Sequence, residues 1–364
     1  MRQLRIAVLF HRSAASATLS YQLGWPEALA QSPRFVCRGF NLADRGLADI
    51  AGLMREIYLE RPDAVVLLHS VFSNQNFLRR GLFWAVAVCP VPKVYFIGNE
   101  YKLMPEKISF CRHLSLSLLI SQSNDPEVLD LYGKTLGCKV GSIPNTGFNP
   151  AIFSPVTPLA ERPIDVGYRS YPAPWYLGNR EKEDIAETFL ENAERLGLHT
   201  DISLSAADRF EPSGYAAFLN RCRGQIGTES GGDFFELTDT TRYRVGAFQK
   251  AHPNATWPEI KARFFDAYEG RKVPMRIVSG RQVEAAACKT VQILFRGRYN
   301  EYFQPDEHYI PLEKDFSNLD ETMEKLRDDA YCTELTESAY ELVMGELTYQ
   351  HLTDQLADLL MDVV

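Results

Sequence analysis

The sequence lacks the excess of positive charge that nucleic-acid-binding proteins need. Its 364 residues include 39 lysines and arginines against 47 aspartates and glutamates, so the formal net charge is -8. Domains that bind nucleic acid usually carry a basic stripe that neutralises phosphates. We therefore expect that this chain does not bind nucleic acid.

Cysteines and long apolar runs are also scarce. The seven cysteines are scattered and odd in number, and none lies in a Cys-x-x-Cys motif, which fits neither a disulfide framework nor a structural zinc site. The longest apolar run, Leu82 to Val91, has about half the length of a membrane-spanning helix, and Leu4 to Phe10 is too short for a signal peptide. We expect a cytoplasmic protein without an integral membrane segment, whereas contact with a membrane surface is left open.

Motifs for common cofactors are missing as well. No Gly-x-Gly-x-x-Gly run follows the first predicted strand, so a nicotinamide or flavin dinucleotide is not expected. The sequence has neither an Asp-x-Asp motif nor a His/Cys cluster at metal-ligand spacing. We predict a site that has no resident cofactor and no metal.

The chain does have a regular alternation of apolar strands with amphipathic helices. In residues 1–155 the pattern predicts strands at 4–10, 35–40, 64–68, 93–97, 117–121 and 139–143, and helices at 47–58, 75–87, 105–114 and 126–136. Such an alternation is typical of a doubly wound parallel sheet. The predicted class is α/β, and the first domain is Rossmann-like.

A proline-rich stretch divides the chain in two. Prolines 144, 150, 155, 158 and 163 lie in a segment with little apolar periodicity, as in a stiff interdomain linker. A second Rossmann-like alternation fills residues 163–345, with a polar segment at about 234–270 that we interpret as a helical insertion containing a helix at 257–268. The last predicted helix, at 348–364, can pack back on the first domain.

Ligands of open α/β sheets bind at the carboxyl ends of the strands, so two such domains would face each other across a cleft. The strand ends carry His69 and Glu100 in the first domain, and Arg169, Lys182 and a glycine-rich turn at 229–233 in the second. Each has a plainer alternative, because a histidine or glutamate at a strand end often only forms structural hydrogen bonds. Basic residues often serve solubility, and paired glycines often only form a tight turn.

The segment 279–295 predicts a helix, a turn and a buried strand. Arg281 and Glu284 are three positions apart, so they share one helix face near its N-terminus. An arginine there can fork onto a phosphate, and a glutamate can accept hydrogen bonds from sugar hydroxyls. The alternative is an intrahelical Arg/Glu pair on a solvated face.

Several segments resemble glycosyltransferases of the GT-B fold. Residues 143–155, Ile-Pro-Asn-Thr-Gly-Phe-Asn-Pro-Ala-Ile-Phe-Ser-Pro, resemble the interdomain signature of these enzymes. Glu284 to Cys288 resembles a helix of family 4, in which the glutamate binds the donor ribose, although Arg276 stands where that family has another glutamate. The run Gly-Thr-Glu-Ser-Gly-Gly at 227–232 offers Glu229 as its match. From Asp165 onward the chain is similar to a bacterial branch tied to surface polysaccharide or natural-product glycosylation.

The resemblance implies a GT-B glycosyltransferase that moves a sugar from a nucleotide-diphosphate donor to a hydroxyl acceptor, by analogy with family 4 with retention of configuration. The first domain would hold the acceptor and the second the donor. For catalysis we predict Glu229 at the donor sugar, with His69 or Glu100 from the opposite domain at the reacting centre. The predicted donor-binding residues are Arg169, Lys182, Ser230, Gly231, Arg281 and Glu284. Two alternatives stay open, namely a nucleotide-sugar epimerase on the same fold and a non-catalytic protein that binds nucleotide sugars.

Overall fold

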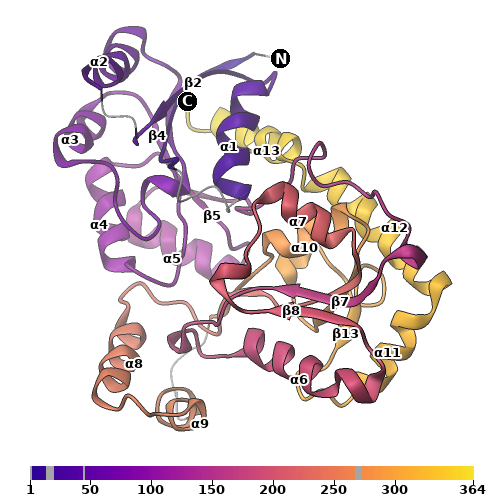
Figure 1. Cartoon of the computed structure of the whole chain (residues 1–364). Coiled ribbons are helices and arrows are strands. Elements are labelled where there is room, and N and C mark those ends of the chain that lie inside the picture. Colours follow the sequence, from indigo (N-terminus) through magenta and orange to yellow (C-terminus); the bar gives the residue numbers. More distant parts are fainter. Residues whose placement is uncertain (1, 14–19, 44–45, 267–272) are drawn as a thin grey trace.

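Two parallel β-sheets, each flanked by helices, form two lobes of the protein (Figure 1). The computed structural model describes residues 2–13, 20–43, 46–266 and 273–364. The predicted α/β class with two Rossmann-like sheets is confirmed.

The N-terminal sheet has six parallel strands in the order β2-β1-β3-β4-β5-β6. These strands are β1 (Leu4–Phe10), β2 (Phe35–Asn41), β3 (Ala64–Leu67), β4 (Lys93–Phe96), β5 (Leu118–Ser121) and β6 (Lys139–Ser142). The connecting helices are α1 (Ser20–Gln31), α2 (Leu47–Arg55), α3 (Arg80–Val88), α4 (Met104–Leu114) and α5 (Pro126–Leu136). All four residues of β3, β4 and β5 are buried, as expected for strands covered on both faces.

The side chains of β1 show how helices cover both faces of this sheet. Leu4, Ile6 and Val8 pack in one hydrophobic cluster that includes α1, whereas Ala7 and Leu9 pack in another that includes α2. Successive residues of a strand point to opposite faces, so the two clusters are the two layers around the sheet.

The structure corrects the predicted helices of this lobe in three places. The helix predicted at 75–87 begins only at Arg80, because the chain turns before it, where the Asn76 side chain accepts the N–H of Leu78 at 2.9 Å. The helix predicted at 47–58 ends as an α-helix at Arg55 and continues as a π-turn. Helix α1 was not predicted, since it contains Pro26 and has no clear amphipathic pattern.

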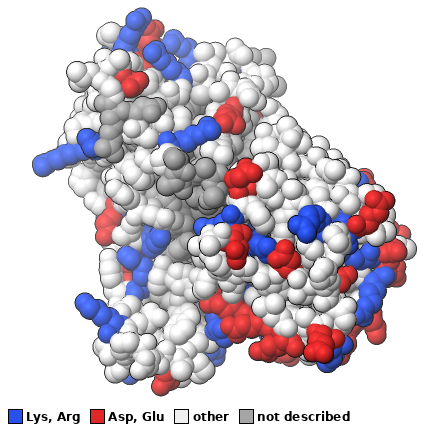
Figure 2. All heavy atoms as spheres, in the orientation of Figure 1, with Lys and Arg blue, Asp and Glu red and all other residues white. Residues whose placement is uncertain are grey.

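The C-terminal sheet has five parallel strands in the order β13-β12-β9-β7-β8. They are β7 (Ile164–Arg169), β8 (Thr200–Ser203), β9 (Cys222–Gly227), β12 (Val291–Phe295) and β13 (Ile310–Leu312). The helices of this lobe are α6 (Glu181–Leu196), α7 (Pro212–Leu219), α10 (Gly280–Ala287), α11 (Leu319–Arg327) and α12 (Asp329–Glu346). Acidic side chains gather on the outer surface over α6, which accounts for part of the negative net charge (Figure 2).

The polar segment after β9 contains more regular structure than predicted. The glycine-rich turn is a short strand, β10 (Ser230–Gly232), paired antiparallel with β11 (Met275–Ile277). Between them lie α8 (Thr240–Ala251) and α9 (Trp257–Lys261), and α9 continues as a π-turn to Asp266. The helix predicted at 257–268 is therefore helical over 257–266, in part as a π-helix, and its positions 267–268 lie outside the described residues.

Polar contacts join the two lobes on both sides of the space between them. On one side the buried Asp239 carboxylate accepts the N–H groups of Leu103 at 2.6 Å and Met104 at 3.2 Å, at the start of α4. On the other side Arg298 donates to Asp125 at 2.9 Å. These contacts hold the strand ends of the two sheets opposite each other.

The last helix, α13 (Tyr349–Met361), crosses back to the N-terminal lobe and lies beside α1 (Figure 1). The ring of Tyr349 meets that of Trp25 edge-on at 5.9 Å, and Arg34 pairs with Asp358 at 2.7 Å. In the described part of the chain no helix is both long and apolar enough to cross a membrane.

Candidate functional site

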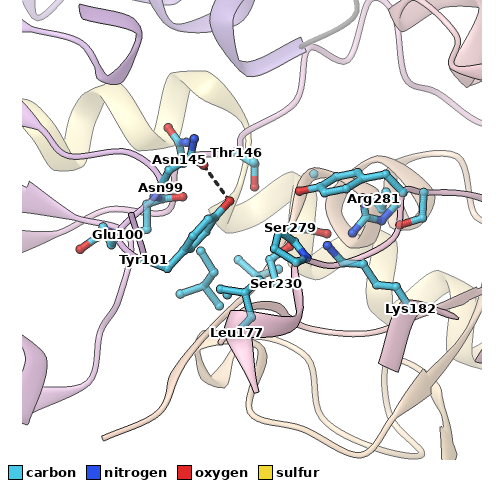
Figure 3. Close-up of a pocket in the computed structure, with 18 of the residues that line it drawn as sticks. Asn99, Glu100, Tyr101, Asn145, Thr146, Leu177, Lys182, Ser230, Ser279 and Arg281 are labelled. Atoms are coloured by element: carbon cyan, nitrogen blue, oxygen red, sulfur yellow. Dashed lines mark hydrogen bonds between the residues drawn. The ribbon is translucent and has the colours of Figure 1, made fainter. Parts of the chain in front are cut away.

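A cavity of about 470 Å³ lies between the carboxyl ends of the two sheets, and both lobes line it. The N-terminal lobe and the linker contribute Asn74, Asn99, Glu100, Tyr101, Lys102, Gln122, Asn145 and Thr146. The C-terminal lobe contributes Arg169, Ser170, Tyr171, Pro174, Tyr176, Leu177, Lys182, Arg209, Phe210, Tyr215, Ser230, Gly231, Met275, Ile277, Val278, Ser279, Gly280, Arg281 and Glu284. Figure 3 shows that Lys182 and Arg281 reach the cavity from one side, opposite Tyr101 and Thr146.

Two cations at helix N-termini form one corner of the cavity. Arg281 belongs to the first turn of α10, and its Nε and Nη2 atoms are buried without a hydrogen-bond partner among the described residues. Lys182 belongs to the first turn of α6, and its amine lies 4.3 Å from the centre of the Tyr171 ring. Helix N-termini and cations both attract anions, so this corner suits a ligand that carries phosphates.

Lys182 is held in an environment that disfavours its charge. Burial, followed by the nearby positive charge of Arg281, lowers the pKa of Lys182 to about 7. The two neighbouring carboxylates do not remove this effect. Glu181 pairs with Arg276 at 2.9 Å and with Lys314 at 2.7 Å, and Glu183, whose charge opposes the lowering, accepts the N–H of Ala173 at 3.1 Å. An anionic ligand would therefore relieve the repulsion between the two cations.

Hydrogen bonds fix the start of α10. Gln282 reaches back to accept the N–H of Ser279 at 3.0 Å, so the residue before the helix is tied to its first turn. Gln225 on β9 donates to the carbonyl of Arg281 at 2.8 Å and accepts from the Tyr215 hydroxyl at 3.2 Å. Glu284, on the next turn of α10, is buried and also lines the cavity.

Ser230 and Gly231 bring backbone close to the cavity. Gly231 has φ +90°, and a Cβ there would lie 1.7 Å from the carbonyl oxygen of Met275 on the paired strand. Only glycine fits this conformation and this close approach. The β10–β11 pair thus places main-chain groups in the cavity wall between the two lobes.

Arg169 lines the cavity, but its charge is already engaged. The guanidinium pairs with Asp201 at 2.7 Å, donates to the carbonyl of Tyr168 at 3.0 Å and lies 4.4 Å from the centre of the Phe218 ring. Its role in donor binding stays a prediction that these contacts do not favour. Lys182 and Arg281, together with the exposed Arg209, leave more charge available to a ligand in this lobe.

Glu100 lies at the cavity, but its carboxylate points away from it (Figure 3). The carboxylate accepts hydrogen bonds from the Ser121 hydroxyl, the Gln122 N–H and the Tyr132 hydroxyl, each at 2.8 Å. Burial raises the pKa of Glu100, and these hydrogen bonds oppose that rise. A carboxylate held in this way supports the turn after β4 and is not placed to meet a reacting hydroxyl.

The other two predicted catalytic residues do not line the cavity. His69 is buried behind the Gly98 turn, and burial lowers the pKa of His69 to about 3, so its ring is neutral at pH 7. The Glu229 carboxylate accepts the backbone N–H groups of Arg298 and Tyr299, both at 3.0 Å. The catalytic roles of His69 and Glu229 stay predictions without support from this geometry.

Glu229 instead holds an unusual loop. Tyr299, Asn300 and Glu301 have φ values of +47°, +55° and +63°, a left-handed conformation that costs energy for residues other than glycine. Asn300 in this loop accepts the N–H of Val278 at 2.7 Å and donates to the carbonyl of Gln122 at 2.9 Å. The loop therefore joins the strand end that precedes α10 to the opposite lobe.

Several cavity residues were missed from the sequence. Tyr171 is one, and its ring lies between Lys182 and Arg209, at 4.3 Å and 4.9 Å. Thr146 is another, and it lies in the segment 143–155, which had suggested a linker and a resemblance to the interdomain signature. That segment does carry a signal, because its Asn-Thr pair is placed directly after the last strand of the first sheet.

No group of three or more His, Cys, Asp or Glu side chains within the described ranges could hold a metal ion. Arg276, which takes the place of a family-4 glutamate, forms an ion pair with Asp233 in addition to its pair with Glu181, and these charges raise the pKa of Arg276. It is turned to the flank of the cavity and is not part of its lining.

Known proteins share the fold at low sequence identity. HepE from Anabaena in complex with UDP-glucose is 13% identical, with 99% of this chain and 100% of that chain covered and a TM-score of 0.53. A glycosyltransferase from Rickettsia africae is 11% identical, with 100% and 99% covered and a TM-score of 0.53. A DNA-modifying β-glucosyltransferase is 9% identical, with 98% and 99% covered and a TM-score of 0.54.

These similarities extend over the whole chain and show the fold, which is the two-domain GT-B architecture that the sequence resemblance implied. No protein-family model and no curated protein matches the sequence. The function is therefore inferred from the position and the chemistry of the cavity.

The contacts of Glu229 lead to the first testable prediction. Glu229→Ala should lower the free energy of unfolding by about 1–3 kcal/mol, because the N–H groups of Arg298 and Tyr299, the second of them buried, lose their acceptor. Glu229→Gln keeps an oxygen at the same place and should retain most of the stability and the turnover. Chemical denaturation and a turnover assay of both variants check this. A folded Glu229→Gln protein with about 10²-fold lower kcat would instead restore the catalytic role.

Proposed function

We propose that the protein is a glycosyltransferase that moves a sugar from a nucleotide-diphosphate donor to a hydroxyl acceptor. The observation that carries this proposal is the pair Lys182 and Arg281 at two helix N-termini. Lys182 is buried and Arg281 partly buried, and both face the interlobe cavity without an ion-pair partner in the part of the chain that the structure describes. The GT-B fold shared with HepE, which binds UDP-glucose, supports it. Two positive charges at one corner suit both the binding of a diphosphate and its departure during sugar transfer.

The cavity offers binding groups for the diphosphate, the ribose and the sugar of such a donor. Arg281, Lys182 and the first N–H groups of α10 would hold the diphosphate and stabilise its charge as it leaves. The buried Glu284 would accept hydrogen bonds from the ribose, in line with the family-4 resemblance. The sugar would then extend past Ser230 and Gly231 toward the N-terminal lobe, where the acceptor meets it.

A glycosyltransferase, a nucleotide-sugar epimerase and a non-catalytic binding protein differ in the product that they release. An epimerase returns a nucleotide sugar, whereas a transferase releases nucleoside diphosphate when an acceptor is present. A non-catalytic binding protein releases neither product. The composite cavity, with a second wall of hydrogen-bonding side chains from the other lobe, favours a two-substrate reaction. A cytoplasmic location, a part in polysaccharide biosynthesis and the absence of nucleic-acid binding stay predictions of the sequence.

The first test of the function is donor binding. Arg281→Ala and Lys182→Met should each weaken UDP-glucose binding by about 1.5–3 kcal/mol, the loss of a charge-assisted hydrogen bond, which is roughly 10-fold or more in Kd. Arg180→Ala is the matched control, because Arg180 lies beside Lys182 in sequence but pairs with Asp184 at 3.1 Å outside the cavity lining. Titration calorimetry measures all three variants. Unchanged affinity in Arg281→Ala would contradict the assignment of the diphosphate site.

The affinity for the donor should depend on pH through Lys182. The pKa of Lys182 is lowered to about 7, and only its protonated form attracts the diphosphate, so affinity should fall as pH rises above this value. Between pH about 6.5 and about 8.5 we expect a loss of roughly fivefold or more in UDP-glucose affinity, since its diphosphate stays ionised throughout. Lys182→Arg should remove this dependence, because arginine keeps its charge. A pH-independent wild-type affinity would refute this use of Lys182.

We further propose that turnover needs no divalent metal and retains the anomeric configuration. Lys182 and Arg281 can supply the charge that a metal would supply to the leaving diphosphate. Inversion needs a base at the incoming hydroxyl, and within the described ranges the one carboxylate on the N-terminal wall, that of Glu100, points away. Chelation should leave the rate unchanged, and proton NMR of the product should show the anomeric configuration of the donor. Rescue of a chelated enzyme by magnesium, or an inverted product, would show that the respective proposal is wrong.

A further inference from the structure

The wall of the cavity that belongs to the N-terminal lobe and the linker is rich in uncharged hydrogen-bonding groups. It presents four carboxamides together with one phenol and one hydroxyl. These residues are Asn74, Asn99, Gln122, Asn145, Tyr101 and Thr146. Carboxamides and hydroxyls both donate and accept hydrogen bonds, as sugar hydroxyls do, and an aromatic ring can cover the C–H face of a sugar.

The turn that carries Tyr101 is built rigidly. The Tyr101 hydroxyl donates to Oδ1 of Asn99 at 3.0 Å, and Nδ2 of Asn99 donates to the Ser73 hydroxyl at 2.9 Å. Asn99 has φ +47°, and Lys107 stabilises this strained turn by donating hydrogen bonds to the carbonyls of Gly98 and Asn99. The wall is therefore preformed for a ligand and needs little ordering on binding.

Thr146 adds an unsatisfied group to this wall. Its Oγ1 atom is buried and has no hydrogen-bond partner among the residues that the structure describes. Figure 3 shows the Thr146 side chain directed at the space between Tyr101 and Arg281. A buried hydroxyl without a partner costs free energy, which a ligand hydroxyl at this position would recover.

Lys102 adds a positive charge at the same wall. Its side chain is half-buried, and within the described ranges its amine forms no hydrogen bond or ion pair. The two carboxylates of this region are occupied, because Glu100 faces the interior and Asp239 accepts from the start of α4 and from Arg242 at 3.0 Å. Burial and the charge of Arg242 lower the pKa of Lys102, so an anionic ligand beside its amine would stabilise the charged form.

We propose that this wall is the acceptor site and that the acceptor is a saccharide with an anionic substituent, either a carboxylate or a phosphate, which Lys102 binds. The inference rests on the proposed glycosyltransferase function and names its second substrate class. The carboxamides, Tyr101 and Thr146 bind the hydroxyls, and Lys102 distinguishes acidic from neutral saccharides. An apolar aglycone would bury these polar groups without partners, which disfavours it.

The test measures saccharide binding while saturating UDP occupies the donor corner. The probes are methyl glucoside, methyl glucuronide, glucose 6-phosphate and the apolar phenol 4-methylumbelliferone, with affinities determined by saturation-transfer NMR titration. Glucuronide or glucose 6-phosphate should bind about tenfold more tightly than methyl glucoside, the size of one charge-assisted hydrogen bond. Whichever of the two binds more tightly identifies the anionic group as carboxylate or phosphate.

Variants assign the effect to the named residues. Lys102→Gln should reduce the preference for the charged saccharide to about twofold or less while leaving methyl glucoside affinity unchanged. Thr146→Val should weaken all saccharides about fivefold, and Thr146→Ser, which keeps the hydroxyl, should restore them. The UDP affinity of each variant is measured in the same samples, and it should equal that of the wild type.

Four results would overturn the inference. These are equal affinity for neutral and charged saccharides, preference for the phenol, no saccharide binding by the UDP-bound wild-type protein, and weaker UDP binding in Lys102→Gln, which would place this lysine in the donor corner. Failure of the wild-type protein to bind UDP at all is a different outcome, because it would remove the proposed function together with this inference.

Discussion

The repulsion between Lys182 and Arg281 is the interaction on which this account depends. Both cations are held at helix N-termini beside one cavity, and burial together with the charge of Arg281 lowers the pKa of Lys182 to about 7. The fold maintains this unfavourable arrangement by fixing α10 through Gln225 and by using Glu181 to neutralise Arg276 and Lys314. Two neighbouring cations without an ion-pair partner among the described residues add nothing to stability, so their place at a cavity supports the proposed anionic ligand.

The cavity exists because the lobes are joined at both of its sides. The Asp239 carboxylate of the C-terminal lobe binds the start of α4, and the loop at Asn300 binds the carbonyl of Gln122. Glu229 holds that loop in its left-handed conformation. Glu229 also lies two positions before Gly231, where the backbone approaches the cavity. The two walls of the cavity are therefore positioned by the same set of interlobe contacts.

Much of the fold could be predicted from the sequence, because buried parallel strands and amphipathic helices leave periodic patterns, and prolines mark the linker. Arg281, Glu284 and Lys182 could be predicted as cavity residues because strand and helix ends of an open sheet share one edge. The direction in which a side chain points could not be predicted. Glu100 and Glu229 follow strand ends, where the pattern predicts catalytic carboxylates. Their carboxylates instead accept hydrogen bonds from N–H and O–H groups that are far away in sequence, and these bonds turn both away from the cavity. Thr146 was missed for a related reason, since it belongs to a segment without periodicity.

Hydrogen exchange of the wild-type protein with and without UDP-glucose shows whether a nucleotide sugar binds at Lys182 and Arg281. We expect slower amide exchange at residues 279–284 and at the start of α6 when the nucleotide sugar is bound. A second cavity of about 240 Å³ between α1 and α13, lined by Glu27, Phe148 and Tyr349 among others, serves as the internal control and should show no change. Protection at that second cavity, or no protection at Arg281 and Lys182 under saturating UDP-glucose, would contradict the account.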